Sequence, residues 1–110
     1  MEQKARRHLE AAGLHFREAN YTCRMGEIDL IMLDQHTLVF VEVRYREHSD
    51  FCNPLETVTR TKQRKLIKAA SHYLLTRIKS HDVPCRFDVV GITSANNEQL
   101  RIEWIKNAFY

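Results

Sequence analysis

The spacing of apolar positions along the chain predicts two helices and five strands. Residues 2–12 and 60–79 carry apolar side chains at helical intervals, and Thr59 is the expected N-cap of the second helix. The order helix, three strands, helix, two strands predicts an α/β fold in one domain, residues 1–110, with helices packed on a mixed five-stranded β-sheet. The expected strands, each a short apolar run or alternation bounded by polar residues, are residues 14–22, 27–33, 37–45, 85–93 and 100–105.

The two central strands are joined by Asp34, Gln35 and His36, a polar connection of hairpin length. If Asp34 opposes Thr37, strand alternation leaves both faces of the hairpin largely apolar, which is typical of strands covered on both sides. One face then carries Ile31, Leu33, Leu38 and Phe40, and the other carries Ile28, Leu30, Met32, Val39, Val41 and Val43.

The same register gathers charged residues at the open end of the hairpin. It places Asp29 across from Glu42 and Glu27 across from Arg44, with all four on one face. Carboxylates on a half-buried face are costly unless something positive pairs with them. Either Arg44 neutralises one of them, or a divalent cation such as Mg²⁺ or Mn²⁺ binds both, since hard cations take carboxylate oxygens. A slip of one residue in the turn would instead disperse the cluster.

Composition excludes several classes of protein but does not identify a binding partner. The net charge is only +3, from 17 Lys and Arg against 14 Asp and Glu, so charge alone does not predict nucleic-acid binding. The three cysteines are scattered and the six histidines lack ligand spacing, which argues against a disulfide framework and a structural zinc site. The sequence has no membrane-spanning run and no signal-peptide core, so we expect a cytoplasmic protein with no membrane partner.

The start of the second helix is unusually basic. Cations there oppose the helix macrodipole, so helix stability does not explain them. They either bind phosphate groups or are simply solvent-exposed surface residues, and the same two interpretations apply to Arg46 and Gln63. The basic residues in question are Arg60, Lys62, Arg64, Lys65 and Lys68.

Four segments carry a resemblance that covers almost the whole chain. Asp29, followed after twelve residues by Glu42, Val43 and Arg44, is similar to the active-site pattern of restriction-endonuclease-like nucleases, PD-(D/E)xK. More specifically, RMGEIDLI, LVFVEVRYR, KQRKLIKAASHYL and RFDVV, in this order, resemble the YraN-like family of small bacterial predicted endonucleases.

The resemblance implies a fold like that of archaeal Holliday-junction resolvases, and with it a set of site residues. Asp29 and Glu42 would be catalytic carboxylates that bind Mg²⁺ or Mn²⁺, with the carbonyl of Val43 near the ion. Glu2 takes the place of a further acid, and Gln63 resembles a glutamine that some of these nucleases hold beside their catalytic lysine. Similarity to the resolvases also implies a homodimer.

Arg44 stands where the nuclease pattern has lysine. An arginine stays protonated, so it cannot accept a proton, but it can hold a phosphate through two hydrogen bonds and stabilise its developing charge. Asp88, in the RFDVV segment, is either a further acid of the site or a structural partner of Arg86.

Two functions of different classes remain open at this point. The first is a metal-dependent endonuclease that hydrolyses DNA phosphodiester bonds, with branched or damaged DNA as candidate substrates. The second is a non-catalytic nucleic-acid-binding module in which Glu42 and Arg44 form an ion pair. A scaffold that binds a protein partner through a sheet edge is a third interpretation that no residue pattern favours.

Overall fold

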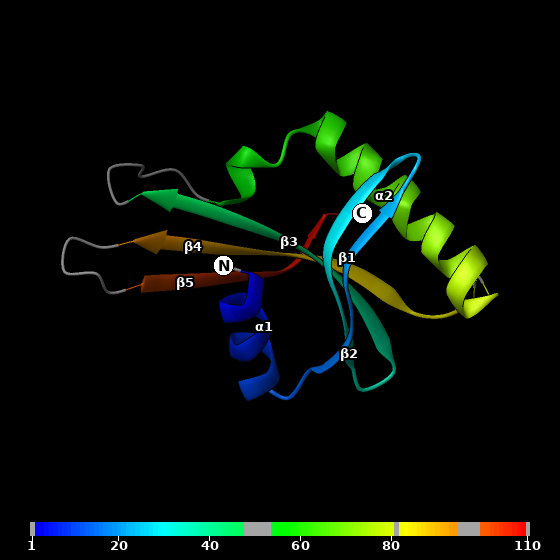
Figure 1. Cartoon of the computed structure of the whole chain (residues 1–110), viewed down its shortest axis with the longest axis horizontal. Helices are drawn as coiled ribbons and strands as arrows, with labels where there is room; N and C mark the ends of the chain where they lie inside the picture. The colour runs from blue at the N-terminus through cyan, green and yellow to red at the C-terminus, as the bar shows by residue number, and fades with distance from the viewer. Residues whose placement is uncertain (1, 48–53, 81, 95–99, 110) are drawn as a thin grey trace.

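The chain forms the predicted order of helices and strands (Figure 1). The computed structural model describes residues 2–47, 54–80, 82–94 and 100–109. Residues 48–53 of the polar loop expected at 47–58, and residues 95–98 of the polar turn expected at 94–98, lie outside this described part. The elements are α1 (Glu2–Ala11), β1 (His15–Cys23), β2 (Gly26–Asp34), β3 (Thr37–Glu47), the 3₁₀ turn η1 (Pro54–Thr57), α2 (Arg60–Tyr73), the π-helical turn η2 (Leu74–Ile78), β4 (Cys85–Ser94) and β5 (Leu100–Phe109).

The five strands form one mixed sheet in the order β1-β2-β3-β4-β5. Only β3 and β4 are parallel, and α2 lies in the connection between them, while the other neighbours are antiparallel. A parallel pair needs such a crossover, because a tight turn returns the chain in the opposite direction. The predicted α/β architecture with a mixed five-stranded sheet is confirmed.

The two helices cover opposite faces of the sheet (Figure 1). Leu66, Ala69 and Tyr73 of α2 pack on Phe40 in one core, and Leu9 of α1 belongs to the second core on the other face. The hairpin β2–β3 is therefore covered on both sides, as its apolar faces predict.

One residue of the hairpin lies on the face opposite to the predicted one. Ile28 packs in the α2-side core with Ile31, three positions later, which strict alternation of side chains would forbid. Tyr21, its partner on β1, lies in that core as well. Ala19 and Leu30 form a pair two residues further along each strand and should share the same face, but they pack on the α1 side. The strong coiling of β1 and β2, visible in Figure 1, accounts for the change of face.

Two elements end several residues away from their expected ends. Thr59 is the N-cap of α2, as predicted, and its hydroxyl oxygen accepts a hydrogen bond from the Lys62 amide at 3.2 Å. After Tyr73, the last α-helical residue, the helix continues as a π-helical turn and ends at Lys79 in a left-handed conformation. Strand β5 reaches Phe109 instead of residue 105, because a bulge opposite β4 lets pairing resume beyond Ile105.

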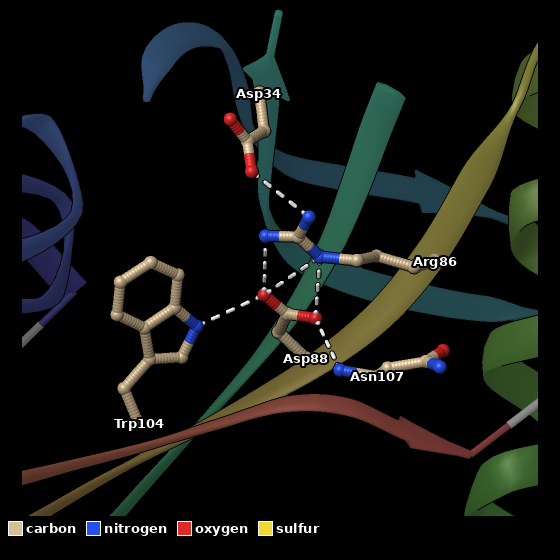
Figure 2. Close-up of polar contacts among 5 residues, drawn as sticks. All are labelled: Asp34, Arg86, Asp88, Trp104 and Asn107. Carbon is tan, nitrogen blue, oxygen red and sulfur yellow. Dashed lines mark hydrogen bonds and ion pairs between the residues drawn. The ribbon is translucent and has the colours of Figure 1, made fainter. Parts of the chain in front are cut away.

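Asp88, fully buried, holds this bulge together (Figure 2). Its carboxylate accepts hydrogen bonds from the Asn107 backbone amide at 2.9 Å and from the Trp104 indole nitrogen at 2.9 Å. Arg86 Nε donates to it at 3.1 Å, while the Nη1 of the same guanidinium donates to Asp34 at 2.9 Å. Asp88 is thus the structural partner of Arg86, one of the two interpretations that its sequence allowed.

Two smaller expectations concern cysteines and membranes. Cys23 and Cys85 are free thiols, and Cys52 lies outside the described residues.

Within the described ranges, neither helix combines the length and the apolar character that crossing a membrane requires.

Candidate active site

The hairpin β2–β3 has the predicted register, but its ladder ends before the charged residues. Paired positions run from Asp34 and Thr37 to Leu30 and Val41. Beyond them a side chain replaces the backbone partner, since Asp29 Oδ2 accepts the Val43 amide hydrogen at 2.8 Å. The sequence prediction that Asp29 and Glu42, and Glu27 and Arg44, would be paired across the ladder is therefore wrong, because the strands separate at Asp29.

Asp29 and Glu42 nevertheless come together. Their carboxyl groups are close enough to share a hydrogen bond, and Glu42 is only 3% exposed. Burial is the main cause that raises the pKa of Glu42 to about 7, and the negative charge of Asp29 raises it further, against the opposing effect of Lys62. A carboxylate pair with this pKa takes up either a proton or a cation near neutral pH.

Two cations approach Glu42 from different elements. Arg44 Nη1 lies 3.2 Å and Lys62 Nζ lies 3.4 Å from the same oxygen, Glu42 Oε2. Arg44 is fixed from its other side, where its Nε donates to Thr57 Oγ1 at 3.0 Å and Thr57 in turn donates to the Pro54 carbonyl at 2.6 Å. The turn η1 therefore sets the position of the guanidinium.

The site has a lysine beside its buried acid, but the lysine comes from α2 and not from β3. The nuclease pattern places it two residues after the glutamate, where this chain has Arg44. Lys62 is in the first turn of α2, where its backbone amide donates to the Thr59 cap and its Nζ reaches Glu42. From its position in the sequence, Lys62 was predicted only to bind phosphate groups of a nucleic acid or to lie on a solvated face. The Thr59 cap followed by a basic first turn was its signal, but helix spacing cannot show which strand that turn faces.

The two other acids lie around Asp29 on the α1 side. Burial, followed by the charges of Asp29 and Glu27, raises the pKa of Glu2, which opens α1. In the amide orientation that satisfies both groups, Asn20 donates to both Glu2 oxygens, at 2.8 and 3.0 Å. Glu27 is exposed, and Arg44, its expected partner across the hairpin, instead donates hydrogen bonds to Glu42 and Thr57. Asp29 is thus the member of the cluster that links Glu2 with Glu42.

The remaining predicted site residues surround this cluster without contacting the acid pair directly. Gln63 donates from its side chain to the Val58 carbonyl at 3.0 Å, which ties the start of α2 to the preceding segment. Arg60 and Lys65 are exposed on α2, and Arg46 is half-buried on β3, two positions beyond Arg44. Arg60 lines a separate groove with Ala108 and Phe109, so these cations are not gathered at the acid pair as Arg44 and Lys62 are.

The donor set at Asp29 and Glu42 fits a small hard cation. Among the described residues, no group of three or more His, Cys, Asp or Glu side chains is arranged to hold a metal ion. Mg²⁺ does not require such a group, since it is usually bound through one or two carboxylates and keeps water or substrate phosphate as its other ligands. Two adjoining carboxyl groups, one of them buried, meet that requirement.

Comparison with known proteins places the chain in a family. Residues 1–92 match the model of the uncharacterised protein family UPF0102. A UPF0102 protein of Pectobacterium carotovorum is 53% identical over 109 residues, covering 98% of this chain and 88% of the relative. One of Coxiella burnetii strain RSA 493 is 52% identical over 107 residues, covering 97% and 86%, and one of Alcanivorax borkumensis is 48% identical over 109 residues, covering 99% and 87%. The chain therefore belongs to the UPF0102 family, the YraN-like group that its four sequence segments resemble.

Proposed function

We propose that this protein is a metal-dependent endonuclease that hydrolyses phosphodiester bonds of DNA. The observation that carries the proposal is the meeting of Asp29 and Glu42 at the open end of the hairpin, with Lys62 and Arg44 both on the buried acid. Two carboxylates and two cations at one point can bind a divalent ion and a phosphate together. The active-site pattern that the sequence resembles predicts the same use of Asp29 and Glu42.

In this proposal Asp29 and Glu42 hold Mg²⁺ or Mn²⁺, with the Val43 carbonyl as a further ligand. Such an ion, when bound, polarises the phosphodiester and lowers the pKa of a coordinated water. The Val43 amide keeps Asp29 Oδ2 in a fixed orientation. Gln63 keeps the segment before α2 in place, and Glu2 adds negative charge near Asp29.

The cations act on the phosphate. Arg44, held by Thr57, presents a permanently charged guanidinium to the scissile group and stabilises the charge that develops in the transition state. Lys62 supplies a second positive charge beside Glu42 and takes the place of the strand lysine of the nuclease pattern. Arg46, Arg60 and Lys65 then contact the phosphates on either side.

The test compares metal binding, DNA binding and cleavage in one set of variants. Calorimetric titration of Mg²⁺ and Mn²⁺, with and without a four-way DNA junction, is expected to show binding that Asp29→Asn and Glu42→Gln abolish. Cleavage of duplex, branched and damaged DNA should require the metal, stop in EDTA and fall at least about 100-fold in both variants and in Lys62→Ala. Glu103→Gln, an exposed acid on β5, is the matched control and should behave as the wild type.

The same experiment decides between the two function classes. Arg44 and Lys62 already lie on Glu42, an arrangement that also suits a non-catalytic nucleic-acid-binding module with a structural ion pair. DNA binding without metal binding and without cleavage under either metal would establish that module and overturn the proposed nuclease. Cleavage lost in Asp29→Asn while DNA binding is retained would support the nuclease.

A further inference from the structure

A cleft on the α1 side of the sheet continues from the acid pair. It has a volume of about 680 Å³ and lies between α1 and the strands β1, β2 and β3. Asp29 and Val43 line it together with Glu2 and its hydrogen-bond partner Asn20, and Phe16 and Tyr45 line it as well. Ligand sites of small organic molecules commonly measure about 300–1,000 Å³, so this cleft is larger than one phosphate and one metal ion need.

The lining away from Asp29 suits a flat and neutral ring. Tyr45 is one of two large apolar side chains exposed in the described chain, at 48%, and aromatic side chains exposed in this way are stacking surfaces for bases. The Arg6 guanidinium carbon lies 3.6 Å from the centroid of the Phe16 ring, so a second flat stacked group borders the cleft. Ala19 and Leu30, which are strand partners, add apolar surface to the lining.

The charges of the lining select the part of a nucleotide that can enter. Glu2 and Asp29 bring negative charge to the cleft, and this charge repels a phosphate. Arg6 is the cation among the lining residues, and its charge is paired with Glu10 at 3.3 Å. The carboxylate oxygens of Glu2 and Asp29 accept hydrogen bonds from the ring N–H and amino groups of a nucleobase. The side-chain amide of Gln3 adds a donor and an acceptor for a base edge, whereas the amide nitrogen of Asn20 already donates to Glu2.

Asp29 belongs both to the acid pair and to this cleft. A phosphate held at the pair therefore places its own nucleotide beside the cleft mouth. A base that is stacked and paired in a duplex cannot turn into it without unstacking, which costs a few kcal/mol, whereas an unpaired base can.

We propose that the cleft binds one unpaired base adjacent to the scissile phosphate, stacked against Tyr45. The substrate class is then DNA with unpaired nucleotides at the cleavage point, such as a bulge, gap or flap. The inference rests on the proposed function for the position of the phosphate, and it can be tested by binding alone, without cleavage.

The experiment measures fluorescence anisotropy in EDTA with three DNA duplexes that differ at one position. They are fully paired, carry one bulged adenine, or carry an abasic residue at the bulge, which keeps the same backbone and phosphates without the base. The wild type should bind the bulged adenine at least about fivefold more tightly than the abasic bulge, since one base–aromatic stack has that effect. Tyr45→Ala should remove this difference and leave affinity for the paired duplex unchanged.

The control variant is Leu75→Ala, which removes the other exposed large apolar side chain, at 55% exposure on η2 and outside the cleft. It should keep the full preference for the bulged adenine. Equal affinity of the wild type for the two bulges, or a preference that survives Tyr45→Ala, would overturn the base site. DNA cleavage with no base preference would remove the cleft proposal alone. A base preference without metal binding or cleavage would remove the nuclease and leave the cleft.

Discussion

Glu42 should make the stability of the protein depend on pH in an unusual direction. Its pKa is about 7 in the folded chain against 4.5 in its ordinary state, because burial and Asp29 oppose its charge. Between these two values the folded chain holds more protons at this position than the unfolded chain. The free energy of unfolding therefore falls as pH rises through that window.

The Glu42→Gln variant has no carboxyl group to titrate there. The free energy of unfolding, measured with urea, should fall between pH 5 and pH 8 by about 1 to 3 kcal/mol more for the wild type than for Glu42→Gln. Glu103→Gln, exposed on β5, should lose as much as the wild type. Equal losses in wild type and Glu42→Gln would show that Glu42 ionises normally. At pH 8, Mg²⁺ should stabilise the wild type, because a bound cation replaces the missing proton.

Asp88 and Asp34 share Arg86 but should differ sharply in their effect on stability. Asp88 is fully buried and accepts hydrogen bonds from Arg86, Trp104 and the Asn107 amide, whereas the Asp34 side chain is 31% exposed and accepts from Arg86. Asp88→Asn turns an amide toward donors and should lower the free energy of unfolding by about 3 kcal/mol. Asp34→Asn should cost about 1 kcal/mol or less. Similar losses in urea unfolding for the two variants would contradict this ranking.

At the residue scale, the sequence predicted which acids meet but not how they meet. Asp29 and Glu42 were identified through the hairpin register, yet Asp29 reaches Val43 because the ladder has already ended at Leu30. The point at which two strands separate depends on the residues that pack around them. The alternation of apolar and polar side chains along each strand does not show that point. Lys62 was placed on the right helix, but its contact with Glu42 depends on the tertiary position of that helix.

The turn η1 is an element whose position should affect both stability and the candidate site. It packs against Gly91 of β4, where an added Cβ would lie 2.2 Å from Pro54 Cγ and 2.7 Å from Pro54 Cβ. Gly91→Ala should therefore displace η1 and lower the free energy of unfolding by about 1 to 3 kcal/mol. Because Thr57 of η1 holds Arg44, DNA binding should weaken as well.

A second substitution separates this clash from other effects of alanine. Pro54→Gly removes the ring that the new methyl group meets, so Gly91→Ala should cost less in the Pro54→Gly background than in the wild type. Additive costs in this double-mutant cycle would mean that the clash with Pro54 does not cause the loss of stability in Gly91→Ala.

Element order and type could be predicted because each segment has one strong period. Both helices begin as expected, and Thr59 caps α2. The extension of β5 to Phe109 was missed because it depends on the bulge at Asp88, a contact between distant residues. The face of Ile28 was missed for a similar reason, since coiling of β1 and β2 is a property of the sheet and not of one strand.

At the scale of the whole molecule, the low net charge of +3 makes the position of the cations more important than their number. Lys62 and Arg44 lie at the acid pair, and Arg60 and Lys65 are exposed on the same half of α2. Each cation that contacts a phosphate of duplex DNA contributes about one unit to the slope of log affinity against log salt concentration. The measured slope therefore reports how many cations touch the DNA.

Two double variants with equal net charge test where the DNA lies. Arg60→Gln with Lys65→Gln should reduce the magnitude of the salt slope by about two units, because the proposed function has both side chains contact phosphates. Arg7→Gln with Lys79→Gln removes the same charge from exposed positions on α1 and after η2, so it should leave the slope nearly unchanged. Anisotropy titrations of one duplex between 50 and 200 mM salt measure both slopes, the range over which phosphate contacts change affinity most visibly. Equal reductions would mean that the DNA responds to total charge and not to a path along α2, and the basic start of that helix would then be a solvated face.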